Sequence, residues 1–270
     1  MHTPFFSVIV VCRNAGEKLH QTVSSVLSQT EGDFEILVKD AGSTDKSLEK
    51  LPEDPRIRVT VSKDQGIYDG MNIAAGIATG RILYFLNCGD LLHDETVLSK
   101  VRAAVEADSL PGSAIYYGDI IEETTGQRVV ANPVMSHFAM YRNIPNHQAC
   151  FYTAEIFKGE KFDLTWKVRA DYEHFLRVVI TKNVRTVPMG FVVADYEGGG
   201  YSESEEGRKR SAEEHKEITG KYFTLRERFC FKAYLILTLQ PLREKIAHGK
   251  HTAALYDRVR NGLLSRGGRA

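Results

Sequence analysis

The sequence predicts an α/β domain with a mostly parallel sheet flanked by helices. Apolar strand-like runs alternate with amphipathic helix-like segments along the first 90 residues, and polar residues follow each strand-like run. This alternation is typical of parallel strands joined by crossover helices. With 270 residues, of which 43% are hydrophobic and 26% are charged, the chain is long enough for one such domain with a sizeable core.

Four segments are predicted as strands because each is a short run rich in apolar, β-branched residues. They are residues 5–11, 34–38, 57–61 and 82–86. The first run is continuous, as expected of a strand that is buried on both faces. Apolar residues at helical spacing predict a helix over residues 19–27, and another is expected at about residues 69–78. Between these helices, Ser43 and Thr44 offer capping oxygens for a short helix.

The second half of the chain has a less regular pattern. Short strands are expected at residues 114–118, 128–131 and 186–193, and helices at residues 153–157 and 171–180. The glycines at positions 198–200 predict a flexible loop.

Polar residues stand directly after each of the four strands predicted in the first half. They are Arg13 and Asn14, Asp40, Asp64, and residues 87–90. Ligands of parallel α/β sheets bind at the carboxyl ends of the strands. We therefore expect these side chains to converge on one ligand site.

The charge of the chain is unevenly distributed although its formal total is zero. From Lys221 to the C-terminus there are eleven Lys or Arg and three Asp or Glu, so this tail carries +8 and residues 1–220 carry −8. A basic tail suggests an acidic partner, and a membrane surface is the partner we expect. A solvated basic extension is the alternative. No aromatic interleaving motif accompanies the charge, so nucleic-acid binding is not expected.

The cysteines and the N-terminus indicate the compartment. Cys12, Cys88, Cys150 and Cys230 have no paired spacing, which fits a reducing compartment and argues against a disulfide framework or a zinc site. The first residues lack a basic flank and a cleavage site, so no signal peptide is expected. We expect a cytoplasmic protein, located at the inner face of the plasma membrane if the tail binds lipid.

Five stretches together resemble the inverting glycosyltransferases of family 2, which have the GT-A fold, and most closely those that build bacterial surface polysaccharides. The stretches are FSVIVVCRNAGEKLHQTVSSVLSQT, FEILVKDAGSTDKS, DQGIYDGMNIAAGIATGRILYFLNCGD, HQACFY and RADYEHFLR. The resemblance covers about residues 5–180. It implies a Rossmann-like GT-A domain over residues 1–220, and residues 221–270 then form a basic, amphipathic helical extension. The implied reaction transfers a hexosyl or N-acetylhexosaminyl group from a nucleotide diphosphate sugar, a UDP-sugar above all, to a glycan or lipid-linked acceptor in polysaccharide biosynthesis.

The resemblance also implies a divalent metal, Mn²⁺ or Mg²⁺, which neutralises the leaving diphosphate. In the family, its carboxylate ligand lies in a D-x-D-like turn after the fourth strand. Here that turn is Asn87-Cys88-Gly89-Asp90, and Asp90 is its only carboxylate. We therefore expect Asp90 to bind the metal and Asn87 to contact the donor. A turn or helix-cap role is the alternative for Asp90.

Seven further residues match the positions that contact the donor in the family: Val11, Arg13, Asp40, Asp64, Gly66, Asp69 and Asn72. Carboxylates suit this task because they accept hydrogen bonds from ribose hydroxyls or a uracil N–H, and Gly66 lets the backbone approach the ligand closely. An Asx-turn is the alternative for Asp40, and helix capping is the alternative for Asp69 and Asn72.

The resemblance places the catalytic base at Asp171, which would deprotonate the acceptor hydroxyl. Glu173 is the alternative candidate for the base. Residues two apart on a helix point to different faces, so only one of the two carboxylates faces the site. His147 and Gln148 resemble a pair that lines the acceptor side of the pocket, where Glu173 is also expected if it faces the cavity. The loop Gly199-Gly200-Tyr201-Ser202 resembles a mobile segment near the diphosphate.

In the tail, the apolar run 229–239 is about half as long as a membrane-spanning helix needs. Basic residues surround it, so the run resembles a helix lying on anionic lipid. Packing on the domain or a homodimer contact is the alternative.

Two other functions remain as alternatives. A degenerate module that binds a nucleotide sugar without turnover is suggested by the missing acids at Asn87 and Gly89. A dinucleotide oxidoreductase shares the strand–helix opening, but it needs a glycine-rich turn after the first strand, and that turn is Cys12-Arg13-Asn14-Ala15-Gly16.

Overall fold

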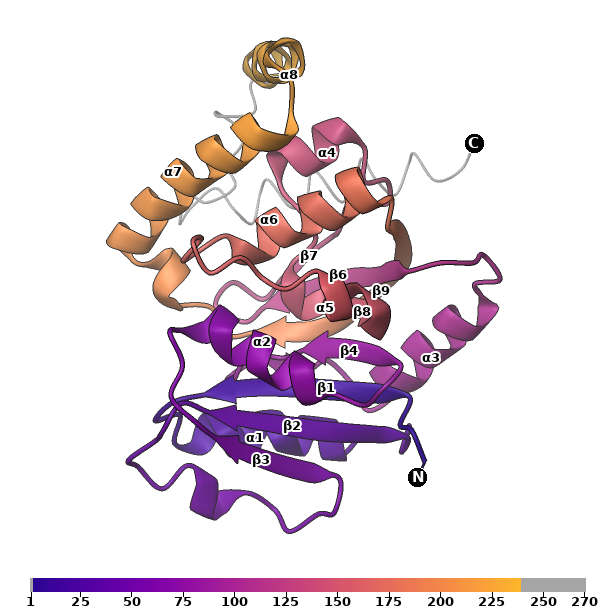
Figure 1. The fold of residues 1–270 in the computed structure, drawn as a ribbon, viewed down its shortest axis with the longest axis vertical. Helices are drawn as coiled ribbons and strands as arrows, with labels where there is room; N and C mark the ends of the chain where they lie inside the picture. Colours follow the sequence, from indigo (N-terminus) through magenta and orange to yellow (C-terminus); the bar gives the residue numbers. More distant parts are fainter. Residues whose placement is uncertain (1, 239–270) are drawn as a thin grey trace. The chain divides into compact units, whose positions relative to one another are not determined.

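The structure, a computed structural model, describes residues 2–238. The chain divides into two compact units, one that ends at Tyr222 and one that begins at Phe223. The first unit holds the sheet and most of the helices, and it is the unit that carries the candidate site (Figure 1).

The first unit is built on one mixed sheet in which the described strands follow the order β3-β2-β1-β4-β8-β6-β9-β5, with β7 beside β6. In chain order these strands are β1 (Phe6–Cys12), β2 (Phe34–Asp40), β3 (Ile57–Val61), β4 (Ile82–Phe85), β5 (Leu91–Leu92), β6 (Ala114–Glu122), β7 (Gln127–Val129), β8 (Cys150–Thr153) and β9 (Arg185–Tyr196).

The predicted parallel half of the sheet is confirmed. Strand β1 lies between β2 and β4 and runs parallel to both, and β2 pairs in parallel with β3. Every residue of β2 and β4 is buried, as their continuous apolar pattern predicts. Beyond β4, strands β8 and β6 each join in the antiparallel direction, which makes the second half of the sheet mixed.

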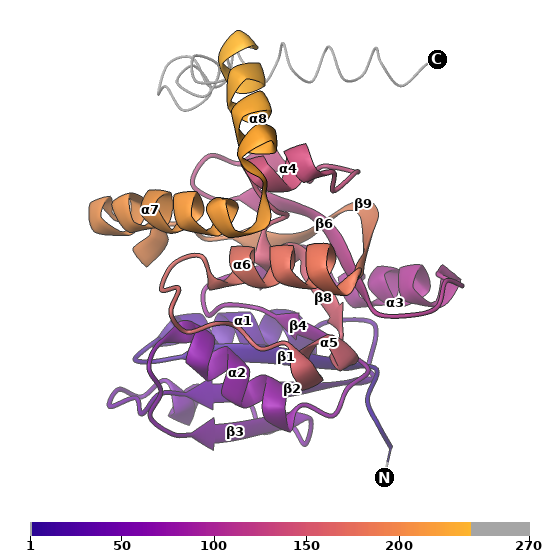
Figure 2. The same ribbon diagram turned by 45° about the horizontal axis from the view of Figure 1, so that its top comes forward.

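Helices cover both faces of the parallel half. They are α1 (Glu17–Leu27) and α2 (Ile67–Ile77), which lie on opposite sides of β1 and β2 (Figures 1 and 2). Leu19, Val23 and Val26 of α1 are fully buried, and each such side chain stabilises the fold by about 1.5–3 kcal/mol relative to its exposed state.

The remaining helices of the first unit follow in chain order as α3 (Val97–Ala107), α4 (His137–Arg142), α5 (Ala154–Gly159), α6 (Ala170–Leu176) and α7 (Glu205–Tyr222). Helix α6 continues as a π-helical turn over Arg177–Thr181. The predicted helices over residues 153–157 and 171–180 correspond to α5 and to α6 with this turn.

The short helix predicted near Ser43 and Thr44 requires a correction. Only one 3₁₀ turn forms there, over Leu48–Lys50, and neither residue caps it. The Ser43 hydroxyl instead donates to Asp40, and its oxygen accepts the backbone N–H of Asn14, 2.7 Å away. These side-chain bonds hold a turn and compete with helix formation.

The second unit contains helix α8 (Leu225–Leu237) within its described part. A capping box begins the helix, because the Thr224 side chain accepts the N–H of Glu227 while the Glu227 side chain accepts the N–H of Thr224. None of the helices in the described part of the chain combines the length and apolar character that a membrane crossing requires. The predicted tail beyond Thr238 lies outside the described residues.

Candidate active site

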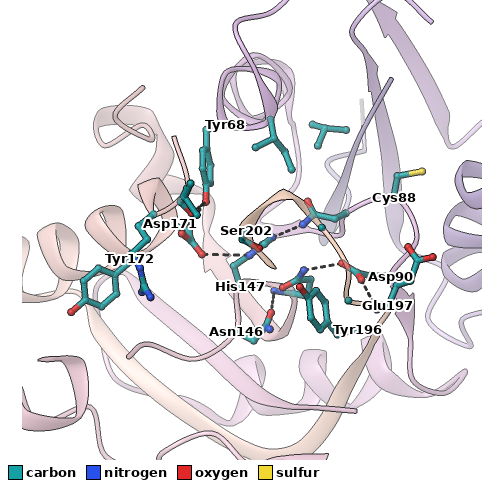
Figure 3. A pocket seen from close by; sticks show the side chains of 18 of the residues that line it. Tyr68, Cys88, Asp90, Asn146, His147, Asp171, Tyr172, Tyr196, Glu197 and Ser202 are labelled. Atoms are coloured by element: carbon teal, nitrogen blue, oxygen red, sulfur yellow. Dashed lines mark hydrogen bonds and ion pairs between the residues drawn. The ribbon is translucent and has the colours of Figure 1, made fainter. Parts of the chain in front are cut away.

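A cavity of about 560 Å³ opens beside the carboxyl ends of β1 and β4. Its lining also includes residues 143–148 before β8, the start of α6, and the segment that follows β9 (Figure 3). The cavity therefore lies at the strand ends where the parallel-sheet rule predicts a ligand. Among the residues predicted from the sequence, its lining contains Val11, Arg13, Asn87, Asp90, His147, Gln148 and Asp171.

Asp171 lies in the first turn of α6 with 20% of its side chain exposed. Its Oδ1 is 2.9 Å from the Tyr68 hydroxyl, and its Oδ2 is 3.5 Å from Nδ1 of His147. Burial by itself raises the pKa of Asp171, but the contacts with His147 and Tyr68 outweigh burial and lower it below its usual value. Asp171 is thus an ionised, oriented carboxylate at neutral pH, which a general base requires.

The loop that places Asp171 is anchored from α7. Both carboxylate oxygens of the buried Glu214 accept backbone N–H bonds from Lys167, Val168 and Arg169, at 2.9–3.0 Å. These N–H groups precede the first turn of α6 and have no partner within the helix. Each would cost about 1–3 kcal/mol if it were buried unpaired, so Glu214 fixes the entry into α6 and the position of its first turn.

His147 joins Asp171 to the turn after β4. The amide nitrogen of Asn87 lies 2.9 Å from Nε2 of His147. With the amide nitrogen as donor, Nε2 is the acceptor, and Nδ1, which faces Asp171, is the ring nitrogen that carries a proton. The same arrangement leaves the buried Oδ1 of Asn87 without a hydrogen-bond partner among residues 2–238. The base and the turn are therefore connected by one row of polar side chains (Figure 3).

The contact with His147 predicts how the activity of a His147→Ala variant depends on pH. Removing the imidazole leaves Asp171 partly buried but takes away a group that lowers its pKa. The pKa of Asp171 should therefore rise, and the acid limb of the pH–kcat profile should move to higher pH. A profile measured from pH 4 to 8 tests this, with Tyr68→Phe as a second variant expected to shift the limb in the same direction. An unchanged acid limb in both variants would contradict the role given to these contacts.

Asp90 lies on the other side of this row of side chains and is only 4% exposed. Its Oδ2 accepts from Nε2 of Gln148 at 2.8 Å, and its Oδ1 accepts the backbone N–H of Glu197 at 3.0 Å. Burial raises the pKa of Asp90 above its usual value. A divalent cation would lower that pKa, because a positive charge favours the ionised carboxylate.

The residues around Asp90 fit a metal ion that is shared with a diphosphate. Within residues 2–238, no group of three or more His, Cys, Asp and Glu side chains is arranged to hold a metal. A cation that bridges phosphates, however, is usually held by only one or two carboxylates plus substrate oxygens. Asp90 lines the cavity and the Oδ1 of Asn87 has no partner, so this donor set matches the hard, oxygen-seeking character of Mg²⁺ or Mn²⁺.

Asp40, Asp64, Gly66, Asp69 and Asn72 lie outside the lining of this cavity. Asp40 is fully buried, and its Oδ2 accepts the N–H groups of Gly42 and Ser43. These bonds correspond to the Asx-turn that was the alternative role for Asp40, in which a short carboxylate satisfies nearby backbone donors. This arrangement therefore does not favour the contact with the nucleotide sugar that was predicted for Asp40.

The others also have structural partners. Asp64 forms a largely buried ion pair with Lys39 at 2.7 Å. Asp69 accepts the N–H of Gln65 at the start of α2, and Asn72 holds both backbone groups of Phe162 at 2.9 Å. Gly66 has φ 128°, a conformation that L side chains rarely adopt, so it permits the entry into α2.

The structure places Glu173 elsewhere than the acceptor side on which it was predicted. Its side chain is fully buried away from the cavity lining and contacts Arg177, Lys221 and the hydroxyl of Tyr222. Since residues two apart on a helix face different directions, the turn that brings Asp171 into the cavity points Glu173 toward α7.

Several cavity residues with charged or hydroxyl groups were not predicted from the sequence, among them Lys18, Tyr68 and Glu197. Tyr68 stands two positions after Gly66, which was predicted to contact the ligand, so its place in the sequence could have identified it as a site residue. No sequence signal identifies Lys18 or Glu197, because they come together through a contact between residues 179 positions apart.

Comparison with known proteins decides the family. The family model described as "Glycosyl transferase family 2" matches residues 7–157, which is more than half of the chain. The chain belongs to glycosyltransferase family 2. This confirms the predicted family and the predicted enzyme class, and it replaces the oxidoreductase alternative.

Relatives of this glycosyltransferase include a "PGL/p-HBAD biosynthesis glycosyltransferase" of Mycobacterium bovis, 35% identical over 211 residues, covering 75% of this chain and 80% of the relative. An "Uncharacterized glycosyltransferase" of Mycobacterium tuberculosis is 31% identical over 185 residues, covering 66% of this chain and 70% of the relative.

Solved structures confirm the GT-A fold of the glycosyltransferase. The mannosyltransferase PcManGT of Pyrobaculum calidifontis, in complex with GDP-Man and Mn²⁺, has a TM-score of 0.64 at 16% identity, covering 97% of this chain and 81% of that one. S. aureus TarS 1-349, in complex with UDP-GlcNAc, has a TM-score of 0.59 at 19% identity, covering 76% of this chain and 64% of that one.

Proposed function

We propose that this glycosyltransferase inverts the anomeric centre of a UDP-sugar and depends on Mn²⁺ or Mg²⁺. The observation that carries the proposal is the placement of two carboxylates in one cavity. Asp171 and Asp90 both line it, with His147 between them (Figure 3), and His147 also contacts Asn87 of the turn that carries Asp90. One carboxylate is suited to act as a base and the other to hold a cation, which is the division of labour that a single displacement requires.

The donor lies along the strand ends in this proposal. Val11 and Arg13 line the cavity where β1 ends, and they receive the nucleotide. Gly198 and Gly200 line the cavity beyond β9, and a glycine-rich segment suits closure over a bound donor. The complexes of TarS with UDP-GlcNAc and of PcManGT with GDP-Man support a nucleotide-sugar donor for this fold.

Asp171 carries the proton step. The acceptor hydroxyl attacks the anomeric carbon on the face opposite the diphosphate, a new C–O bond forms, and the bond to the phosphate oxygen breaks. The proton of the hydroxyl passes to Asp171, and the bonding electrons leave with UDP. Tyr68 and His147 restrain the two carboxylate oxygens, so that the base is oriented before the acceptor arrives.

Asp90 and Asn87 would hold the divalent cation at the diphosphate. When bound, the cation supplies Lewis-acid stabilisation of the charge that develops on the leaving group. The exposed Lys18, which also lines the cavity, adds a second positive charge near the same place.

The acceptor that we propose is a lipid-linked glycan or glycolipid. The mycobacterial relative whose name refers to PGL/p-HBAD biosynthesis supports this class. The acceptor would approach from the side of residues 143–148, which line the cavity next to His147.

Helix α8 supports a further proposal, namely that the tail binds an anionic membrane surface. Leu225, Phe229 and Ile236 share one helical face and are 78%, 75% and 63% exposed. Arg228 stands beside that face, and Lys232 lies on it, three residues after Phe229 and four before Ile236. An exposed apolar face with basic neighbours is typical of helices that lie in a lipid interface.

A Phe229→Glu variant should bind more weakly than the wild-type protein to vesicles that contain anionic lipid, because it places a negative charge on the apolar face. Cosedimentation with anionic and with neutral vesicles measures this. Equal binding to both kinds of vesicle, or no effect of the variant, would argue against a lipid role. A dimer in analytical ultracentrifugation that the variant disrupts would favour the homodimer alternative.

Thermal-shift measurements with UDP-, GDP- and dTDP-sugars, each with and without Mn²⁺, test the proposed function. A preferred donor stabilises the folded protein by mass action, so a UDP-sugar with Mn²⁺ should give the largest shift. Hydrolysis of that donor then separates an enzyme from a binding module without turnover. If no nucleotide sugar stabilises the protein, the proposed donor class is wrong.

A further inference from the structure

The turn after β4 lacks a side chain at Gly89, and a carboxylate from another strand lies where that side chain would be. A Cβ atom built on Gly89 would lie 3.2 Å from Cδ of Glu197 and would collide with one of its carboxylate oxygens. Gly89 also has φ 108°, a conformation that L residues rarely adopt. An acid at this position would therefore strain the backbone and would displace the carboxylate of Glu197.

The sheet register explains how Glu197 reaches this place. Strands β5 and β9 are antiparallel, with Leu91 opposite Asp195 and Leu92 opposite Ala194. Continuing this register by two residues sets Gly89 opposite Glu197, on the same face as the 91–195 pair. Side chains at directly opposed positions have Cβ atoms about 4.5–5.5 Å apart. Glu197 is thus the cross-strand neighbour of the missing side chain.

Three contacts tie Glu197 to the turn and to the cavity. Its backbone N–H donates to Oδ1 of Asp90 at 3.0 Å. Its carboxylate oxygens lie 2.7 Å and 2.8 Å from Nζ of Lys18, and its side chain lines the cavity with 36% exposed. Glu197 is therefore an accessible carboxylate beside Asp90, and it is paired with the ammonium group of Lys18.

We propose that Glu197 supplies the second carboxylate of the divalent-cation site, in place of an acid at position 89. This inference rests on the metal-dependent function proposed above. Asp90 from the turn and Glu197 from the end of β9 then form a donor set of two carboxylates, completed by the free Oδ1 of Asn87 and by diphosphate oxygens. Such a set is what Mg²⁺ and Mn²⁺ take at phosphate sites.

Lys18 has a defined part in this arrangement. Its side chain is 53% exposed, so it is free to move when a divalent cation takes over the carboxylate of Glu197. The ammonium group then faces the same diphosphate, where it adds positive charge. Without a cation, the lysine neutralises Glu197 and prevents it from repelling a nucleotide.

Binding of Mn²⁺ to the full-length protein in the presence of UDP tests the inference without relying on turnover. The electron paramagnetic resonance signal of free Mn²⁺ gives the dissociation constant. We expect Glu197→Gln, which keeps the size and loses the charge, to raise that constant roughly ten-fold or more. Asp195→Asn is the matched control, because it removes a carboxylate charge from the same strand at a residue that pairs with His93 outside the cavity lining, and it should leave the constant within about three-fold of wild type.

A second measurement separates a ligand from a structural role. Without metal, Glu197→Gln should bind UDP as well as wild type or more tightly, because it removes a negative charge and releases Lys18. A variant that was only misfolded would bind UDP more weakly under both conditions, and that result would overturn the inference, as would an unchanged Mn²⁺ constant. If the wild-type protein itself showed no UDP-dependent Mn²⁺ binding, the metal-dependent function would fall together with this inference.

Discussion

Replacing Asp171 by Asn should reduce the turnover number for sugar transfer by about 10²- to 10⁴-fold, which is the usual contribution of a general base. Asn keeps the size of the side chain and can still accept from Tyr68, but it cannot take a proton from the acceptor hydroxyl. The affinity for the nucleotide sugar should change little, because Asp171 lies in α6 and the nucleotide is placed at the ends of β1 and β4.

The measurements are steady-state kinetics of transfer and calorimetric titration with the donor. Glu173→Gln is the comparison variant, since Glu173 lies two residues away and its side chain pairs with Arg177, Lys221 and Tyr222, which lie outside the cavity lining. We expect Glu173→Gln to lower the midpoint of thermal unfolding and to keep the folded enzyme active. Near-normal turnover in Asp171→Asn would show that the base lies elsewhere.

Replacing Asp90 by Ala should abolish the contribution of metal to donor binding. The dissociation constant of the UDP-sugar in Mn²⁺ should rise roughly ten-fold or more, to the value that the wild-type protein shows in EDTA. The reason is that Asp90 is the carboxylate of the turn that lines the cavity, and without it the cation would lose the direct ligand that we propose. Titrations of both proteins in Mn²⁺ and in EDTA provide the four constants that this comparison needs.

Asp90→Asn controls for the structural contacts of this residue, because an amide oxygen can still accept the N–H of Glu197 while a charged ligand is lost. The loss of metal-dependent binding should therefore occur in both variants. If Asp90→Asn bound the donor as tightly as wild type in Mn²⁺, the role of Asp90 would be the turn and cap role that its contacts with Gln148 and Glu197 also permit.

The parallel half of the sheet could be predicted from the sequence because its signals are local. Continuous apolar runs define β1, β2 and β4, and helical spacing defines α1. The position of Asp171 follows from its place in the sequence stretch that resembles the family. These predictions depend on residues that are near one another in the chain, so no knowledge of tertiary contacts was necessary.

The parts that could not be predicted depend on distant contacts. Whether Asp40 binds a ligand or closes a turn is decided by Ser43 and Cys12, which compete for its oxygens. The burial of Glu173 depends on Lys221 and Tyr222, 48 and 49 residues away. Glu197 reaches the turn only through the pairing of β5 with β9. Periodicity contains no information on any of these contacts.

The row formed by Asp171, His147 and Asn87 makes the two halves of the reaction thermodynamically dependent on each other. A ligand that engages the free oxygen of Asn87 polarises the amide, and the amide acts on the imidazole that holds Asp171. Such coupling is reciprocal. The proton affinity of the base therefore depends on whether the donor is bound, and donor affinity must change with the protonation of the base by the same factor.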